Sequence, residues 1–132
     1  MTPISDIQWH GSDRDDLTLK TVKPGLHVGT RTQAEMRWPG RHLYRIEIAT
    51  GCRTIRLRDT GGWSDKRLRA AAKRAPVAVY LNRYEGLPLD AINAAAENDN
   101  APDYQFRKKV AGAEDSAIIF DIDVIRCVER VI

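Results

Sequence analysis

The sequence predicts an α+β fold in which short helices flank a strand-rich core, and three observations point to this class. Residues 43–48 alternate apolar and polar side chains, as a strand with one buried face does, and residues 54–58 repeat that pattern. Residues 77–81 form a continuous apolar run typical of a buried central strand. Helical signals occur only as short stretches between such segments.

The remaining expected strands are short and lie beside turn-forming residues. The first of them ends at Gly11, and the second follows the turn-like pair Pro24-Gly25. Two apolar segments near the C-terminus are also expected to be strands. The full set of expected strands is 7–10, 26–28, 43–48, 54–58, 77–81, 118–120 and 124–128.

Few segments favour helix. The expected helices lie at about residues 32–37, 65–75 and 88–97. The middle one is the best defined, because Ser64 is a typical N-cap residue, the alanines favour helix and Pro76 ends it. Residues 97–103 are polar and are expected to form a loop.

The length of 132 residues predicts one domain spanning residues 1–132. No apolar run approaches the roughly 20 residues of a membrane span, and the first residues lack a signal-peptide pattern, so we expect a cytoplasmic protein. Cys52 and Cys127 are too few for a disulfide framework. The histidines His10, His27 and His42 show no zinc-ligand spacing, so no bound metal is expected.

Positive charge is concentrated in one segment. The chain carries a net charge of +3, yet residues 53–74 hold eight Lys and Arg and two acidic residues, so the remainder is net negative. This segment is either a solvated helix face or a surface that docks an acidic partner or a nucleic-acid backbone. The expected contact residues are Lys66, Arg67, Arg69 and Arg74. No aromatic residues interleave with these charges to stack on bases, so a host protein is the expected partner ahead of nucleic acid.

Common catalytic motifs are absent, since there is no G-x-S-x-G elbow, P-loop, G-x-G-x-x-G or H-E-x-x-H sequence. Three local patterns remain, at residues 9–12 (Trp-His-Gly-Ser), 25–30 (Gly-Leu-His-Val-Gly-Thr) and 114–121 (Glu-Asp-Ser-Ala-Ile-Ile-Phe-Asp). Gly11 has no side chain, so a ligand can approach the backbone there and pair an amide with the Gly11 N–H and C=O, while the His10 imidazole donates a hydrogen bond to a ligand hydroxyl. The alternative is that His10 is a structural residue at a strand end.

Two further segments join this series, residues 57–63 (Leu-Arg-Asp-Thr-Gly-Gly-Trp) and 80–86 (Tyr-Leu-Asn-Arg-Tyr-Glu-Gly). Taken in order, the five patterns resemble the ADP-ribosyltransferase superfamily, in its His branch of poly(ADP-ribose) polymerases and diphtheria-toxin-like proteins. The chain is most similar to the small phage- and prophage-type members, over about residues 7–128. The resemblance implies a split pair of small sheets with NAD bound in the cleft between them.

The resemblance also implies roles for individual residues. His10 would hydrogen-bond the adenosine ribose, and the backbone of Gly11 would clamp the nicotinamide amide. His27 stands where relatives place an aromatic residue. Trp38 falls where a ring would stack on the nicotinamide, or else it is a half-buried anchor beside Pro39. The expected NAD-binding residues are His10, Gly11, Ser12, His27, Thr30 and Trp38.

The catalytic acid is where the sequence departs from the family pattern, because Ser116 occupies the position of the family's glutamate. Asp115 is the first candidate acid, provided that a bulge turns it into the cleft. Glu114 is the second, because it shares the face of Ser116 at period two. Glu85, in a different loop, is a further candidate. Alternatively, Asp115 and Ser116 cap a turn before the last hairpin. The expected catalytic residues are Asp115, Glu114 and His10.

The resemblance implies an NAD-dependent mono-ADP-ribosyltransferase of phage or prophage type, a glycosyltransferase that modifies a host macromolecule. One carboxylate is enough for this reaction, since the main requirement is to stabilise an oxocarbenium-like transition state. The alternative is a catalytically inactive protein of the same fold that docks through residues 53–74, for example an inhibitor of host defence such as an anti-CRISPR protein.

Overall fold

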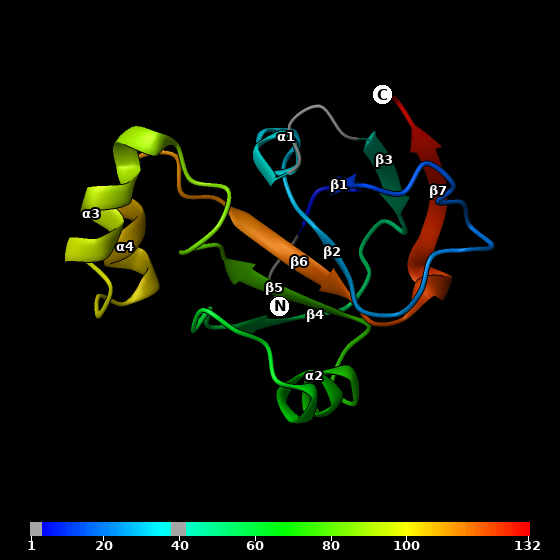
Figure 1. Cartoon of the computed structure of the whole chain (residues 1–132). Coiled ribbons are helices and arrows are strands. Elements are labelled where there is room, and N and C mark those ends of the chain that lie inside the picture. Colours follow the sequence, from blue (N-terminus) through cyan, green and yellow to red (C-terminus); the bar gives the residue numbers. More distant parts are fainter. Residues whose placement is uncertain (1–3, 38–41) are drawn as a thin grey trace.

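The chain forms two small β-sheets with short helices around them, which confirms the predicted α+β class (Figure 1). The computed structural model describes residues 4–37 and 42–132. The sheets have the strand orders β1-β3-β7 and β2-β6-β5-β4; β4 and β5 run parallel and the other pairs antiparallel. The strands are β1 (Ile7–Ser12), β2 (Leu26–Val28), β3 (His42–Ile48), β4 (Thr54–Leu57), β5 (Val77–Leu81), β6 (Asp115–Ile119) and β7 (Ile125–Arg130). The helices are α1 (Arg31–Arg37), α2 (Asp65–Ala72), α3 (Ile92–Glu97) and α4 (Asp103–Lys109), with 3-10 turns η1 (Leu89–Ala91) and η2 (Ile122–Val124).

Every predicted strand is present, with ends shifted by a few residues. The predicted helix at 65–75 is α2, capped by the Ser64 side chain as expected, and the predicted helix at 88–97 divides into η1 and α3. Helix α4 was not predicted. Phe106 is its one buried residue, so it shows no apolar periodicity in the sequence. Among the described residues, no helix combines the length and the apolar character that crossing a membrane requires.

The main core lies between the two sheets. Alternate residues of β3, namely Tyr44, Ile46 and Ile48, are buried in it and show the period-two pattern seen in the sequence. The second sheet contributes Val28, Val77, Val79, Ala117 and Ile119. Each fully buried aliphatic side chain stabilises the fold by about 1.5–3 kcal/mol. The Tyr44 hydroxyl donates to the Arg14 carbonyl at 2.6 Å, so its polar end is satisfied inside the core.

A pair of backbone hydrogen bonds joins the two sheets. Trp9 of β1 donates its N–H to the Gly29 carbonyl at 2.8 Å, and the Gly29 N–H donates to the Trp9 carbonyl at 2.9 Å. Gly29 directly follows β2, so this bridge sets the end of β2 against β1. The two histidines of the sequence motifs, His10 and His27, lie immediately beyond it.

A buried arginine holds the α3–α4 region against the end of β5. Arg83 is 2% exposed; its guanidinium pairs with Asp103 at 3.0 Å and donates to the carbonyls of Asn98, Asp99 and Ala101. Its guanidinium carbon lies 4.3 Å from the centre of the Phe106 ring. The segment predicted as a loop at 97–103 is therefore held in place by its contacts with the Arg83 guanidinium.

Removing this cation should destabilise the protein. We expect Arg83→Ala to lower the free energy of unfolding by about 3 kcal/mol or more, because it leaves Asp103 and several carbonyls without their partner. Urea denaturation followed by circular dichroism measures the change. Arg45→Ala is the control, since Arg45 forms a half-exposed pair with Glu47 at 3.7 Å and should cost less than about 1 kcal/mol. Equal losses in the two variants would contradict the anchoring role of Arg83.

Candidate functional site

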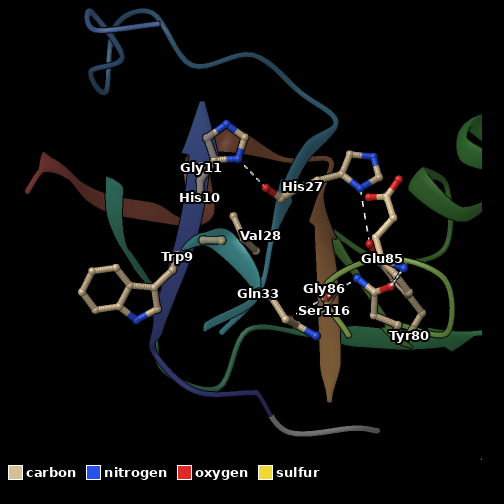
Figure 2. A pocket seen from close by; sticks show the side chains of 13 residues that line it. Trp9, His10, Gly11, His27, Val28, Gln33, Tyr80, Glu85, Gly86 and Ser116 are labelled. Atoms are coloured by element: carbon tan, nitrogen blue, oxygen red, sulfur yellow. Dashed lines mark hydrogen bonds between the residues drawn. The ribbon is translucent and has the colours of Figure 1, made fainter. Parts of the chain in front are cut away.

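A narrow cavity of about 40 Å³ lies where the two sheets meet, just beyond the Trp9–Gly29 bridge (Figure 2). It is lined from four parts of the chain: the end of β1, strand β2, helix α1, and the β5–β6 pair with the loop after β5. The lining residues are Trp9, His10, Gly11, His27, Val28, Gly29, Gln33, Ala34, Tyr80, Asn82, Glu85, Gly86 and Ser116. The cavity thus brings together residues from four of the five sequence patterns, namely 9–12, 25–30, 80–86 and 114–121.

His10 is held by the backbone of the neighbouring strand. Its Nδ1 lies 2.6 Å from the carbonyl oxygen of His27. Since a carbonyl only accepts, Nδ1 carries the hydrogen, and in the neutral imidazole Nε2 is then the acceptor nitrogen. The prediction that the His10 ring donates to a ligand hydroxyl is therefore refined, because its Nδ1–H already serves to position the ring.

The backbone of Gly11 faces the cavity edge of β1. Residues two apart along a strand direct their N–H and C=O groups toward the same edge. The N–H and C=O of Trp9 both bond to Gly29. The N–H and C=O of Gly11, two residues further along, therefore face the same edge of β1 and point toward the cavity that His27 also lines. That edge offers one donor and one acceptor side by side, the complement of a primary amide.

Ser116 is locked in a hydrogen-bond network. It is 4% exposed; its hydroxyl donates to Gln33 Oε1 at 2.9 Å and accepts from Asn82 Nδ2 at 3.1 Å. Gln33 also accepts from the Thr30 N–H and donates to the Glu114 carbonyl, both at 3.0 Å. These bonds tie α1 to β6, and they give the Ser116 hydroxyl a structural role at the position of the family's acid.

Glu85 supplies the carboxylate of the cavity. It follows β5, and its N–H donates to Asn82 Oδ1 at 3.0 Å, which fixes the start of its loop. Figure 2 shows its side chain directed toward His27 and Tyr80, with which it shares the cavity. The His27 Nδ1 and the Tyr80 hydroxyl are 3.4 Å apart. The sequence alone placed Glu85 behind two other acids, but the structure brings it to the site.

Asp115 lies on the opposite face of β6. The prediction that a bulge turns it into the cleft is wrong, because β6 pairs regularly with β5, Tyr80 opposite Ser116 and Leu81 opposite Asp115. Arg56 binds the Asp115 carboxylate with two hydrogen bonds of 2.8 and 3.0 Å, and Arg107 adds a third of 2.9 Å. The side-chain hydrogen bond to Asp115 raises the pKa of Arg56.

The other predicted acid is also outside the cavity. Glu114 is exposed, and it is its backbone carbonyl that contacts Gln33 and the Asn82 N–H. The alternative interpretation of Asp115 and Ser116 as a turn cap is wrong, because both residues belong to β6. Of the three candidate acids Asp115, Glu114 and Glu85, Glu85 is the one that lines the cavity.

The remaining predicted NAD contacts separate into two groups. His10, Gly11 and His27 line the cavity. Ser12 and Thr30 serve as caps instead: the Ser12 hydroxyl accepts from the Arg14 N–H at 3.1 Å, and the Thr30 hydroxyl accepts from the Gln33 N–H at 3.1 Å at the start of α1. Trp38 lies outside the described residues.

The cavity residues that sequence analysis did not single out as site residues include the polar and aromatic side chains of Trp9, Gln33, Tyr80 and Asn82. Tyr80 and Asn82 stand two residues apart at the end of a strand, so their shared face was a readable signal. Gln33 gave no such signal, because its partners come from distant parts of the chain. In the described ranges, no group of three or more His, Cys, Asp and Glu side chains is placed to hold a metal ion.

Among the wider hollows that share residues with the cavity, one borders His10 and another borders Glu85. The hollow beside His10 has a volume of about 240 Å³ and is bordered by Arg14 and Lys23. The hollow beside Glu85 has a volume of about 310 Å³ and shares His27, Tyr80, Asn82 and Glu85 with the cavity. A ligand larger than the cavity can therefore extend in two directions from it.

Comparison with known proteins identifies no relative: no family model, no curated protein and no solved structure matches this chain.

The close packing around Gly29 makes this residue a test of the site's geometry. A Cβ atom at Gly29 would lie 2.2 Å from Gln33 Oε1 and 3.0 Å from the Ser116 hydroxyl. We expect Gly29→Ala to lower the free energy of unfolding by about 1–3 kcal/mol, since it displaces the Gln33 side chain.

Urea denaturation measures this change, and Gly62→Ala is the control, because a Cβ there meets no atom within 4 Å. Adding Gln33→Ala to Gly29→Ala should restore part of the loss relative to the sum of the two single changes. A Gly29→Ala protein as stable as Gly62→Ala would show that Gln33 does not occupy this position.

Proposed function

We propose that this protein is an NAD-dependent mono-ADP-ribosyltransferase with an ADP-ribosyltransferase-like split pair of sheets, of phage or prophage type, acting on a host macromolecule. One observation carries the proposal. The outward backbone edge of Gly11, the His10 imidazole and the Glu85 carboxylate meet in one narrow cavity at the junction of the two sheets. This is the set of groups that the reaction needs. His10 and Gly11 are the residues to which the resemblance gives these roles, whereas Glu85 comes from a different segment than the acid that the resemblance implies.

The backbone of Gly11 recognises the nicotinamide amide in this proposal. Its C=O accepts from the amide NH₂ and its N–H donates to the amide oxygen, as a paired strand would do. His10 Nε2 accepts a hydrogen bond from the adenosine ribose hydroxyl, while Nδ1–H stays on the His27 carbonyl. The dinucleotide then extends into the hollow on the His10 side, where Lys23 provides positive charge for the pyrophosphate.

The Glu85 carboxylate supplies the chemical step. When the bond between nicotinamide and the ribose C1′ breaks, nicotinamide leaves as a neutral molecule with the bonding electron pair. Glu85 stabilises the positive charge that develops on the ribose. As the acceptor's nucleophile bonds to C1′, the same carboxylate takes its proton.

The second candidate function is a catalytically inactive docking protein that uses residues 53–74. The observation that favours it concerns β6, where the resemblance places the catalytic acid. Ser116 stands at that position and its hydroxyl is engaged in two hydrogen bonds, and the neighbouring Asp115 is paired with two arginines. This candidate predicts no nicotinamide release and no binding of NAD.

The two functions are separated by nicotinamide release from labelled NAD. We expect Glu85→Gln to reduce release by about 100-fold or more, the usual contribution of a general acid or base. His10→Ala should weaken NAD binding, measured by calorimetry. Asp115→Asn is the matched control for removal of a carboxylate, and it should retain release within a few-fold.

If the unmodified protein neither binds NAD nor releases nicotinamide, the transferase proposal fails. If Asp115→Asn abolishes release while Glu85→Gln does not, the assignment of the acid is wrong and the transferase proposal stands. Circular dichroism of each variant checks that the fold is retained.

A further inference from the structure

The hollow on the Glu85 side has aromatic walls. Trp63, Tyr80 and Tyr84 line it together with Asp59, Gly61 and Glu85, among others. The rings of Trp63 and Tyr80 pack at a tilt, with centroids 4.8 Å apart. Tyr84 is 48% exposed, and its hydroxyl donates to Asp99 at 2.7 Å. That bond raises the pKa of Tyr84, so the ring remains a neutral phenol. A flat, uncharged ligand fits between such walls.

The basic segment adjoins this hollow through one side chain. Arg67 of α2 places its guanidinium carbon 4.5 Å from the centre of the Trp63 ring. The same guanidinium donates to the Arg58 carbonyl and to the Thr60 hydroxyl, so it fastens α2 to the loop that forms the hollow's rim. The expectation that no aromatic residue interleaves with the charges of residues 53–74 is therefore wrong, because Trp63 belongs to this segment and packs against Arg67. The fold adds Tyr80 and Tyr84 beside it.

Most cations of this segment have no carboxylate partner. Arg56 pairs with Asp103 and Asp115, whereas the other seven form no ion pair with the described residues. Lys66, Arg69 and Lys73 follow at spacings of three and four residues, so they share one solvent-facing side of the helical segment. We name these seven cations the basic cluster: Arg53, Arg58, Lys66, Arg67, Arg69, Lys73 and Arg74.

Resting on the proposed transferase function, we propose that the acceptor is a single-stranded nucleic acid. Its phosphates lie along the basic cluster, and one unpaired base enters the hollow against Trp63 and Tyr84. The charges inside the hollow support this orientation. Asp59 is 5% exposed and bonds the N–H groups of Gly61 and Arg83, and Glu85 lies at the mouth of the cavity. Two carboxylates repel a phosphate but accept hydrogen bonds from a base.

The acceptor atom follows from this placement. The amino group of adenine, cytosine or guanine reaches Glu85, which is also the group that faces the reacting ribose. The amino nitrogen bonds to C1′, nicotinamide leaves with the electron pair of the broken bond, and one amino proton passes to the Glu85 carboxylate. No oxidant or further reactant is required.

Oligonucleotide binding tests the docking step without NAD. Fluorescence anisotropy with labelled 12-residue single-stranded DNA and RNA should show binding that weakens with salt. The triple change Lys66→Glu, Arg69→Glu and Lys73→Glu should reduce affinity at least 10-fold and flatten the salt dependence. Lys108→Glu with Lys109→Glu, on α4, is the control for altered net charge and should bind within a few-fold of the unmodified protein.

Transfer of label from NAD to the same oligonucleotides tests the acceptor. We expect labelled single strands, little label on a duplex, and at least a 10-fold loss in Trp63→Ala that Trp63→Phe partly restores. Nicotinamide release in the absence of acceptor is measured in parallel for the unmodified protein and for the Lys108→Glu, Lys109→Glu control, and it should be the same in both.

The outcomes distinguish the two proposals. Nicotinamide release with label found on proteins of a host lysate, and none on either oligonucleotide, overturns the nucleic-acid acceptor and leaves the transferase in place. Absence of NAD binding and of release overturns the transferase and, with it, the acceptor. Oligonucleotide binding equal in the triple variant and the control overturns the basic cluster as the docking surface.

Discussion

The backbone bridge between Trp9 and Gly29 is the constraint on which the site depends. Two sheets that pack face to face share a core, but nothing in that packing brings their strand ends together. The two hydrogen bonds of the bridge do so, and beyond it β1 and β2 diverge around the cavity. Gly29 has to be glycine because Gln33 and Ser116 fill the space of a side chain. The bridge at Gly29 and the hydrogen bond between Ser116 and Gln33 therefore depend on each other, because both need the space that a side chain at residue 29 would fill.

The acid of the site stands on a loop, and the fold compensates for the freedom that a loop ordinarily has. Three polar anchors hold the segment that carries Glu85. Asn82 accepts from its N–H, Asp59 accepts from the N–H of Arg83, and the Arg83 guanidinium gathers the carbonyls of the 98–101 turn. Each anchor is a buried group whose bonds would be costly to break. These bonds set the position of the loop relative to β5 and to the 98–101 turn.

Local pattern was sufficient for the strands but not for the acid. Period-two alternation in β3 and the apolar run of β5 are properties of neighbouring residues, so the sequence predicts them directly. The orientation of Asp115 depends on Arg56 and Arg107, which only the strand order β6-β5-β4 and the unpredicted helix α4 bring to it. The motif 80–86 contained Glu85, Tyr80 and Asn82. These residues line the cavity and Asp115 does not, because of tertiary contacts that no local pattern encodes.

Tertiary contacts also determine which positive charges of the chain form ion pairs. Arg56, Arg83 and Arg107 form ion pairs with Asp103 and Asp115, while the basic cluster forms no ion pair within the described part of the chain. The segment's excess charge thus stays unneutralised by those residues, and the neighbouring hollow carries Asp59 and Glu85. A polyanion bound to such a surface keeps its phosphates outside and can present only parts without negative charge to the cavity. Both proposals meet this condition, since the parts placed against the carboxylates are the cationic nicotinamide ring and the ribose of the dinucleotide, and the neutral base of the nucleic acid.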